Sequence, residues 1–280
     1  MITYKPLPIE DPEVEYSLSW EKYDVVEFAI KYKQWIQSSQ NAKIVGLDNF
    51  NYYITDGVTG AFADFEKSYP TLQSVVFRGE YPYHRDTGCS RLDTVEDLCT
   101  GHKLYISYPF SSHGMMHEDF DKIVDICEQK EIPIFLDCAY FGACQFPDLV
   151  INKSCIKFIA FSLSKAFATG RCKIGICFTN EKNTYMSLLN QYSYVNHIAM
   201  GIHDNILNNF TPDHMFNKYR KRQIEICKKY ELKPSDTVFL AYSYNPKFPG
   251  FDRDGTVSRY GISDLLVNGY DREIQWISKK

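Results

Sequence analysis

The chain has 280 residues, of which 44% are hydrophobic and 24% are charged, and its formal net charge is -4. This composition is typical of a globular protein with room for one large core and a smaller unit. The acidic balance gives no electrostatic footprint for nucleic acid, and no apolar run is long enough to cross a bilayer. We therefore expect neither nucleic acid nor a membrane as a partner.

The cysteines and the N-terminus bear on the compartment. The chain has nine cysteines, an odd number, without paired C-x-x-C spacing. Residues 1–6 lack the charged-then-apolar pattern of a signal peptide. These features predict reduced thiols and a cytoplasmic protein. Cys172 and Cys177 have no histidine neighbours at ligand spacing, so no metal site is expected.

The first predicted element is a helix within residues 20–39, where Tyr23, Val26 and Ile30 recur at helical spacing. A second helix is predicted over residues 118–130, whose apolar side chains also fall on one face. Six segments have the length and apolar character of β-strands, namely 52–55, 74–78, 103–108, 132–137, 157–162 and 174–179. Alternating strands and helices predict a mostly parallel sheet with helices on both faces.

Ligands of such sheets bind at the carboxyl ends of the strands, and two candidate segments lie there. Lys165 follows the apolar strand 157–162 and precedes a loop of small residues. Asp137 ends the strand 132–137, and Tyr140 comes three residues later. An amine that attacks an aldehyde needs a lowered pKa, which burial and nearby cations provide. This pattern favours a Schiff-base lysine at position 165.

These segments resemble the fold-type I pyridoxal-phosphate enzymes, in particular the class I/II aminotransferases, whose patterns are D-x-A-Y and S-x-S-K followed by a glycine-containing loop and a basic residue. The resemblance implies pyridoxal 5'-phosphate as the cofactor. Lys165 would form the internal aldimine, Asp137 would pair with the protonated pyridine nitrogen, and Tyr140 would hydrogen-bond the phenolic oxygen.

The same resemblance implies the fold and the domains. It predicts a three-layer α/β/α large domain with a short N-terminal arm at residues 1–205. A reduced C-terminal α+β small domain would follow at residues 206–280. The chain is markedly shorter than its relatives, so substrate closure would work differently or depend on a partner subunit.

The resemblance also places residues around the cofactor phosphate. Ser162 and Lys173 fall where the family has its phosphate-binding serine and arginine. Lysine binds phosphate as a point charge without the bidentate fork of arginine, and Arg171 is the alternative source of that charge.

Two further segments complete the expected cofactor site. The D-G-V-T-G-A turn after the first strand resembles the family's T-x-G-x-x-x-A segment. Amides of Gly57, Val58 and Thr59 at a helix N-terminus would therefore hold the phosphate. Tyr81, with Tyr83 as the alternative, stands where the family has an aromatic residue stacked on the pyridine ring.

Two positions concern the phenolic oxygen and the substrate. Ser111 replaces the family's asparagine, which contacts the phenolic oxygen, in the segment Y-P-F-S-S-H-G. Arg259 lies in a segment that resembles the strand with the substrate-carboxylate arginine. The alternative for Arg259 is a surface arginine on an edge strand.

The expected activity is therefore amino-group transfer between an amino acid and a keto acid. The alternatives are another pyridoxal-phosphate reaction on an amino acid, as in a decarboxylase, lyase or cyclase, or a non-catalytic binding protein of this fold. The resemblance also implies a homodimer.

Overall fold

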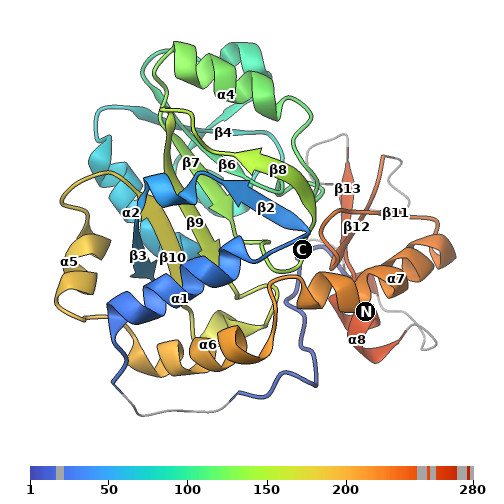
Figure 1. Ribbon diagram of the computed structural model, residues 1–280. Coiled ribbons are helices and arrows are strands. Elements are labelled where there is room, and N and C mark those ends of the chain that lie inside the picture. Colours follow the sequence, from blue (N-terminus) through green and yellow to red (C-terminus); the bar gives the residue numbers. More distant parts are fainter. Residues whose placement is uncertain (17–21, 245–250, 253–256, 270–275, 278–280) are drawn as a thin grey trace.

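The computed structural model describes residues 1–16, 22–244, 251–252, 257–269 and 276–277. Its largest element is a seven-stranded sheet (Figure 1). Its order is β3-β10-β9-β7-β6-β4-β5. The strands are β3 (Asn51–Thr55), β4 (Gln73–Phe77), β5 (Ser90–Leu92), β6 (His102–Ser107), β7 (Ile134–Cys138), β9 (Ile156–Ser162) and β10 (Gly175–Thr179). Neighbouring strands from β9 to β5 are parallel, and β10 is antiparallel to both β9 and β3. The predicted mostly parallel sheet and its six predicted strands are confirmed, and β5 was not predicted.

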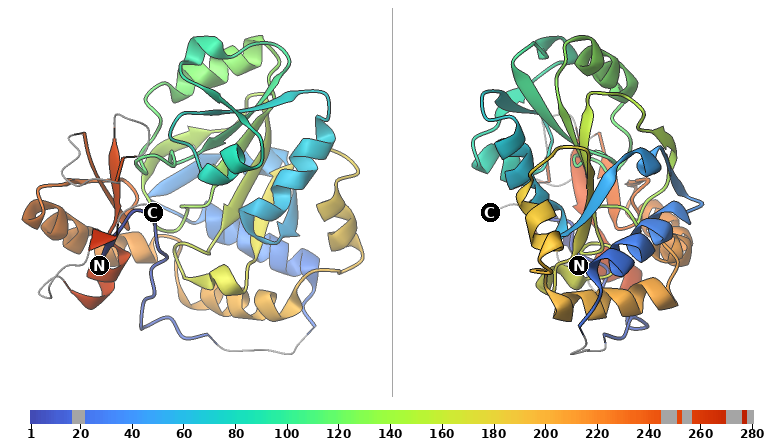
Figure 2. Two further views of the ribbon diagram at one scale, coloured as in Figure 1. Left: turned by 180° about the vertical axis from the view of Figure 1, so that it is seen from behind. Right: turned by 60° about the vertical axis from the view of Figure 1, so that its left-hand side comes forward.

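Helices cover both faces of this sheet, because side chains alternate between two apolar clusters. In β7, Phe135 packs with helix α2 (Gly57–Ser68), whereas Ile134 and Leu136 belong to the cluster on the other face. Figure 2 shows α2 and α1 (Val25–Gln37) on opposite sides of the sheet. Helices α3 (Pro82–Asp86) and α5 (Tyr185–Gln191) lie on the α2 side, and α4 (Phe120–Gln129) and α6 (His197–Asn209) on the α1 side. The predicted helix at 118–130 is confirmed as α4.

The first helix differs from its prediction. It begins after Asp24, whose side chain accepts hydrogen bonds from two first-turn amides, and residues 17–21 of the predicted range lie outside the described residues. The predicted apolar face was wrong, since Val26 and Ile30 are 64% and 38% exposed. The buried face instead consists of Val25, Phe28, Ala29, Tyr32, Trp35 and Ile36. Helical spacing fits both faces, and the face with the larger aromatic surface is the one buried.

A second sheet joins the two ends of the chain and lies beside the first (Figure 1). Its order is β11-β12-β13-β1-β14. Its strands are β1 (Ile2–Thr3), β11 (Lys233–Pro234), β12 (Leu240–Ser243), β13 (Ser258–Gly261) and β14 (Trp276–Ile277). Helices α7 (His214–Lys229) and α8 (Ser263–Asn268) pack on it, and β2 (Ala42–Val45) and β8 (Phe146–Val150) form a separate parallel pair. The predicted division at 205/206 falls within α6, and it stays a prediction.

Within these described ranges, no helix has the length and apolar character needed to span a membrane.

Candidate active site

The predicted site residues come from strand ends that meet at one edge of the large sheet. Asp137 in β7 is the register partner of Ser107, the last residue of β6. Ser162, the last residue of β9, faces Gly175 at the start of β10, and Gly175 faces Thr55 at the end of β3. The topology therefore brings together the segments that carry Asp137, Ser162 and the turn after β3.

Asp137 is a buried carboxyl group, with 6% of its surface exposed. The Ala139 amide donates a hydrogen bond of 2.9 Å to its Oδ1. Burial raises the pKa of Asp137 from 3.8 to about 7, and the negative charge of Glu80 adds to this effect. The Ala139 amide and the positive charge of Lys165 act in the opposite direction.

Lys165 lies in the loop after β9, and its Nζ donates a hydrogen bond of 3.1 Å to the carbonyl oxygen of Pro6. Burial lowers the pKa of Lys165, and the positive charges of Arg259 and Lys173 lower it further. Asp137 opposes this shift. A lowered pKa leaves more of the amine neutral, and the neutral amine is the form that attacks carbonyl carbons and takes protons.

A cradle for an anion lies at the N-terminus of α2. Gly57 begins this helix with a φ of +67°, and a methyl group in place of its α-hydrogen would lie 3.6 Å from Ser162 Oγ and 3.8 Å from Lys173 Cβ. Within the described residues, the Asp56 side chain caps none of the first-turn amides. The start of α2, the Ser162 hydroxyl and the side-chain carbons of Lys173 therefore lie close together, and such a helix N-terminus with a hydroxyl and a lysine nearby suits a phosphate.

Gly175 allows the helix to start so close to the sheet. A β-carbon at this position would lie 2.5 Å from the Phe161 carbonyl oxygen and 2.8 Å from the α-carbon of Gly57. No side chain fits there without displacing backbone. The place of the anion cradle therefore depends on the absence of a side chain at Gly175.

Lys173 and Arg171 differ in their position. The side-chain carbons of Lys173 lie near Gly57, within 3.9 Å of where a β-carbon would stand, and its positive charge lowers the pKa of Lys165. Arg171 lies in the 3-10 turn Thr169–Arg171, and both residues are exposed, so exposure does not distinguish them. The geometry therefore favours Lys173 as the phosphate-binding cation.

Tyr81 and Tyr140 lie beside Asp137. Burial raises the pKa of Tyr81, and the charges of Asp137 and Tyr140 raise it further. Tyr81 is 44% exposed, and its ring stacks on that of Tyr83 with centroids 5.9 Å apart. Tyr140 is buried and packs edge-on against Phe239. The charge of Asp137 therefore acts on Tyr81, which favours Tyr81 over Tyr83 as the stacking residue.

Arg259 is buried, with 3% of its surface exposed, and it lies in β13 between β12 and β1. The alternative of a surface arginine on an edge strand was therefore wrong. Its guanidinium donates hydrogen bonds to the main-chain carbonyls of Ser111 (2.7 Å) and Tyr4 (3.2 Å). Ser111 thus contacts Arg259 through its backbone. A guanidinium group has five N–H donors, so these two hydrogen bonds do not exclude a substrate carboxylate.

The N-terminal segment crosses the site, which sequence reasoning missed. Tyr4 and Pro6 contact Arg259 and Lys165 through main-chain carbonyls, and the Ile9 amide donates to the carbonyl of Lys165 at 3.0 Å. Any residue provides such carbonyls, so no residue type signals these contacts. Tyr16, farther along the same segment, is also attached to the loop after β9, because its hydroxyl donates a hydrogen bond of 2.5 Å to the Phe167 carbonyl.

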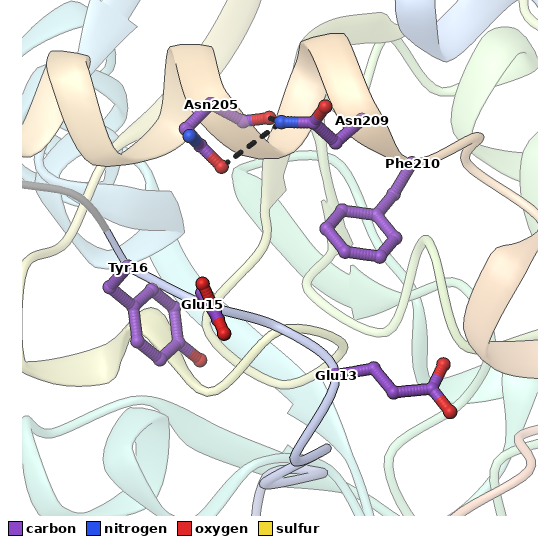
Figure 3. Close-up of a pocket in the computed structure, with 6 residues that line it drawn as sticks. All are labelled: Glu13, Glu15, Tyr16, Asn205, Asn209 and Phe210. Carbon is purple, nitrogen blue, oxygen red and sulfur yellow. Dashed lines mark hydrogen bonds between the residues drawn. The ribbon is translucent and has the colours of Figure 1, made fainter.

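A cavity of about 350 Å³ lies between this N-terminal segment and α6 (Figure 3). Its lining residues are Glu13, Glu15, Tyr16, Asn205, Asn209 and Phe210. None of the predicted site residues lines it, so this cavity is separate from the candidate active site.

A metal site is not apparent in the part of the chain that the structure describes, where no three His, Cys, Asp or Glu residues are placed to share an ion.

No protein-family model and no curated protein matches this sequence. Several solved structures resemble the fold. A PLP-bound putative aminotransferase from Clostridium difficile 630 has a TM-score of 0.67 and 11% identity, over 91% of this chain and 83% of that chain. An aminotransferase from Mycobacterium tuberculosis has a TM-score of 0.63 and 16% identity, over 90% and 83%. L-threonine-O-3-phosphate decarboxylase from Porphyromonas gingivalis has a TM-score of 0.61 and 12% identity, over 90% and 89%.

At these identities the likeness shows the fold alone. The chain has the fold of these proteins, with a mostly parallel central sheet covered by helices. The fold class and the aminotransferase-like architecture predicted from the sequence are confirmed.

Proposed function

We propose that this protein is a pyridoxal-phosphate-dependent aminotransferase that moves an amino group between an amino acid and a keto acid, with Lys165 as the Schiff-base lysine. The observation that carries this proposal is the placement of Lys165. Its buried amine has a lowered pKa, and the charges of Asp137 and of Lys173 in the anion cradle both act on it. The fold similarity to aminotransferases supports it.

The residues fit the three polar features of the cofactor, which are an aldehyde, a basic ring nitrogen and a phosphate. Lys165 suits the aldehyde, and the buried carboxyl of Asp137 suits a protonated ring nitrogen. Ser162, Lys173 and the first amides of α2 suit the phosphate. The positive and negative groups of the site thus match the charges of the cofactor.

When bound, pyridoxal phosphate withdraws electrons from the α-carbon of an attached amino acid. Asp137, as a carboxylate, would hold a proton on the ring nitrogen, and the Tyr140 hydroxyl would donate to the phenolic oxygen. Lys165, once displaced by the substrate amine, would take the proton from the α-carbon, and its lowered pKa raises the fraction of neutral amine available for this step. Arg259 would bind the substrate carboxylate through its guanidinium group.

The proposal includes a homodimer in the cytoplasm. Exposed apolar side chains on and near α5 and at the start of α6 support an interface, namely Tyr185, Leu188, Tyr192, Tyr194 and Ile198. All nine cysteines are free, which supports a reducing compartment.

A second candidate function is decarboxylation of an amino acid. The similarity to the Porphyromonas gingivalis decarboxylase favours it. The proposed cofactor contacts would serve either reaction, since the bond that breaks depends on how the substrate is oriented.

The test is a titration of the purified protein with pyridoxal phosphate, with near-visible absorbance as the readout. Single amino acids are then added to the loaded protein. We expect a band that one class of amino acid removes, with release of the matching keto acid. Release of carbon dioxide instead would identify the decarboxylase. A band that no amino acid changes would indicate a binding protein, and no band would contradict the proposal.

A further inference from the structure

Glu80 is a buried acid that the proposed reaction does not use. It stands at the turn after β4 with 7% of its surface exposed. Its Oε1 accepts a hydrogen bond of 2.7 Å from the Ser107 amide. Its Oε2 accepts bonds from the Ser107 hydroxyl at 2.7 Å and from the Tyr81 amide at 2.8 Å. Three donors on one carboxyl group stabilise its ionised form.

These bonds connect Glu80 to the part of the site that surrounds Asp137. Ser107 is the register partner of Asp137 on the neighbouring strand, so Glu80 is attached directly beside it. The Tyr81 amide belongs to the proposed ring-stacking residue. Glu80 therefore holds the turn that carries Tyr81 against the end of β6.

Several charged or titratable groups act on Asp137 from the surrounding elements. Glu80 acts from the turn after β4 and Lys165 from the loop after β9. Tyr81 and Cys138 are also in electrostatic contact with Asp137. Of these groups, only Glu80 makes the proton on Asp137 harder to remove by its negative charge at neutral pH.

We propose that Glu80 is a positioning residue for the ring-nitrogen end of the cofactor: it fixes Tyr81 beside Asp137 and supplies a second negative charge that keeps the ring nitrogen protonated. This inference rests on the proposed function. Two buried carboxylates next to one ring nitrogen stabilise its cationic form more than one does. Glu80 acts through Asp137 and Tyr81 and needs no contact with the substrate.

The proposal has a consequence for the proton balance of cofactor binding. In the free protein, Asp137 holds a proton up to a pH of about 7. Pairing with a protonated ring nitrogen would require Asp137 to be a carboxylate, so binding would displace the proton that Asp137 holds, to the ring nitrogen or to the solvent. Without the charge of Glu80, the pKa of Asp137 is lower, so a smaller fraction of Asp137 is protonated in the free protein and fewer protons are displaced on binding.

The experiment measures proton uptake on binding of pyridoxal phosphate, by calorimetry in two buffers of different ionisation enthalpy. Glu80→Gln keeps the shape of the side chain and removes its charge. At about pH 6.5 we expect this variant to take up more protons per site than the unaltered protein, because the pKa of Asp137 falls when the charge of Glu80 is removed. Glu80→Asp, which keeps the charge, should restore the original uptake. Glu96→Gln, which removes an exposed carboxylate paired with Lys122, is the matched control and should change nothing.

Equal uptake by Glu80→Gln and the unaltered protein would overturn the inference, even if binding weakened, because a purely structural role does not change the proton count. The unaltered protein gives a second test that needs no variant. Its proton uptake should rise as the pH rises through about 7, and a flat curve would overturn the inference. Failure to bind pyridoxal phosphate at all would instead contradict the proposed function.

Discussion

The two ends of the candidate site are built in different ways. At the ring end, Asp137 and Glu80 are both less than a tenth exposed and are held by strand ends. At the anion end, the backbone of Gly57 and the exposed residue Lys173 surround a point at the start of α2. The ring end depends on buried charge, so a change of charge should disturb it. The anion end depends on backbone position, so a change of shape should disturb it.

Between the two ends lies Lys165, and its loss should have the largest effect. Lys165→Ala removes the amine that both ends act on, and we expect turnover to fall by on the order of 10⁴-fold. The near-visible band of bound cofactor should also disappear. Lys182→Ala, an exposed lysine outside the site, is the control and should keep both. Normal amino transfer by the Lys165 variant would contradict the role of Lys165 as the Schiff-base lysine between the two ends of the site.

At the ring end, Asp137→Asn replaces a buried acid by a neutral group of the same shape. We expect turnover to fall by about 10²–10³-fold, since the ring nitrogen loses its anionic partner. Steady-state rates at saturating amino acid measure this loss. A variant with unaltered rates would show that Asp137 is not the ring partner.

The same variant tests the charge of Asp137 in the cofactor-free protein. Its pKa is raised from 3.8 to about 7 on folding, so the carboxyl favours the fold while protonated. This contribution is lost as the pH rises from about 4 through 7. Compared with the unaltered protein, Asp137→Asn should therefore gain stability between pH 5 and pH 8 in urea denaturation. A constant difference across this range would contradict the raised pKa.

At the anion end, Gly175→Ala changes only shape. Its methyl group would overlap the Phe161 carbonyl and the backbone of Gly57, so we expect a loss of about 1–3 kcal/mol in the free energy of unfolding. Affinity for pyridoxal phosphate should fall as well, because the start of α2 moves. Gly170→Ala is the matched control, since a β-carbon there meets no heavy atom within 4 Å. Equal effects of the two substitutions would contradict the close approach at Gly175.

The smallest effect is expected from the single cation of the cradle. Lys173→Ala should weaken binding of pyridoxal phosphate by roughly tenfold, because one charged partner of the phosphate is lost. Arg171→Ala should leave the affinity almost unchanged, since Lys173 is the cation placed near Gly57 and acting on the pKa of Lys165. Fluorescence titration of both variants measures the difference. A larger loss of affinity in Arg171→Ala than in Lys173→Ala would identify Arg171 as the phosphate-binding cation.

The large sheet and the positions of Asp137 and Lys165 at its strand ends could be predicted because they depend on local sequence patterns. Apolar runs gave the strands, and side chains of particular types stood directly after them. The buried face of α1 could not be predicted, since Val26 and Ile30 share the helical spacing with Phe28 and Tyr32. Only the packing of the large aromatic rings decides between them.

Contacts made by the backbone escaped prediction for a different reason. The carbonyls of Tyr4 and Pro6 reach Arg259 and Lys165 because β1 pairs with β13, and this pairing joins residues that are far apart in the sequence. Glu80 was missed because an acid after a strand is common at protein surfaces. Its burial and its three donors are visible only in the folded chain.

The most direct test of the central claim is to identify the lysine that carries the cofactor. The protein is incubated with pyridoxal phosphate, reduced with borohydride, digested and analysed by mass spectrometry. We expect one modified peptide, with the added mass on Lys165. Modification spread over exposed lysines, or confined to a lysine other than Lys165, would contradict the proposed site.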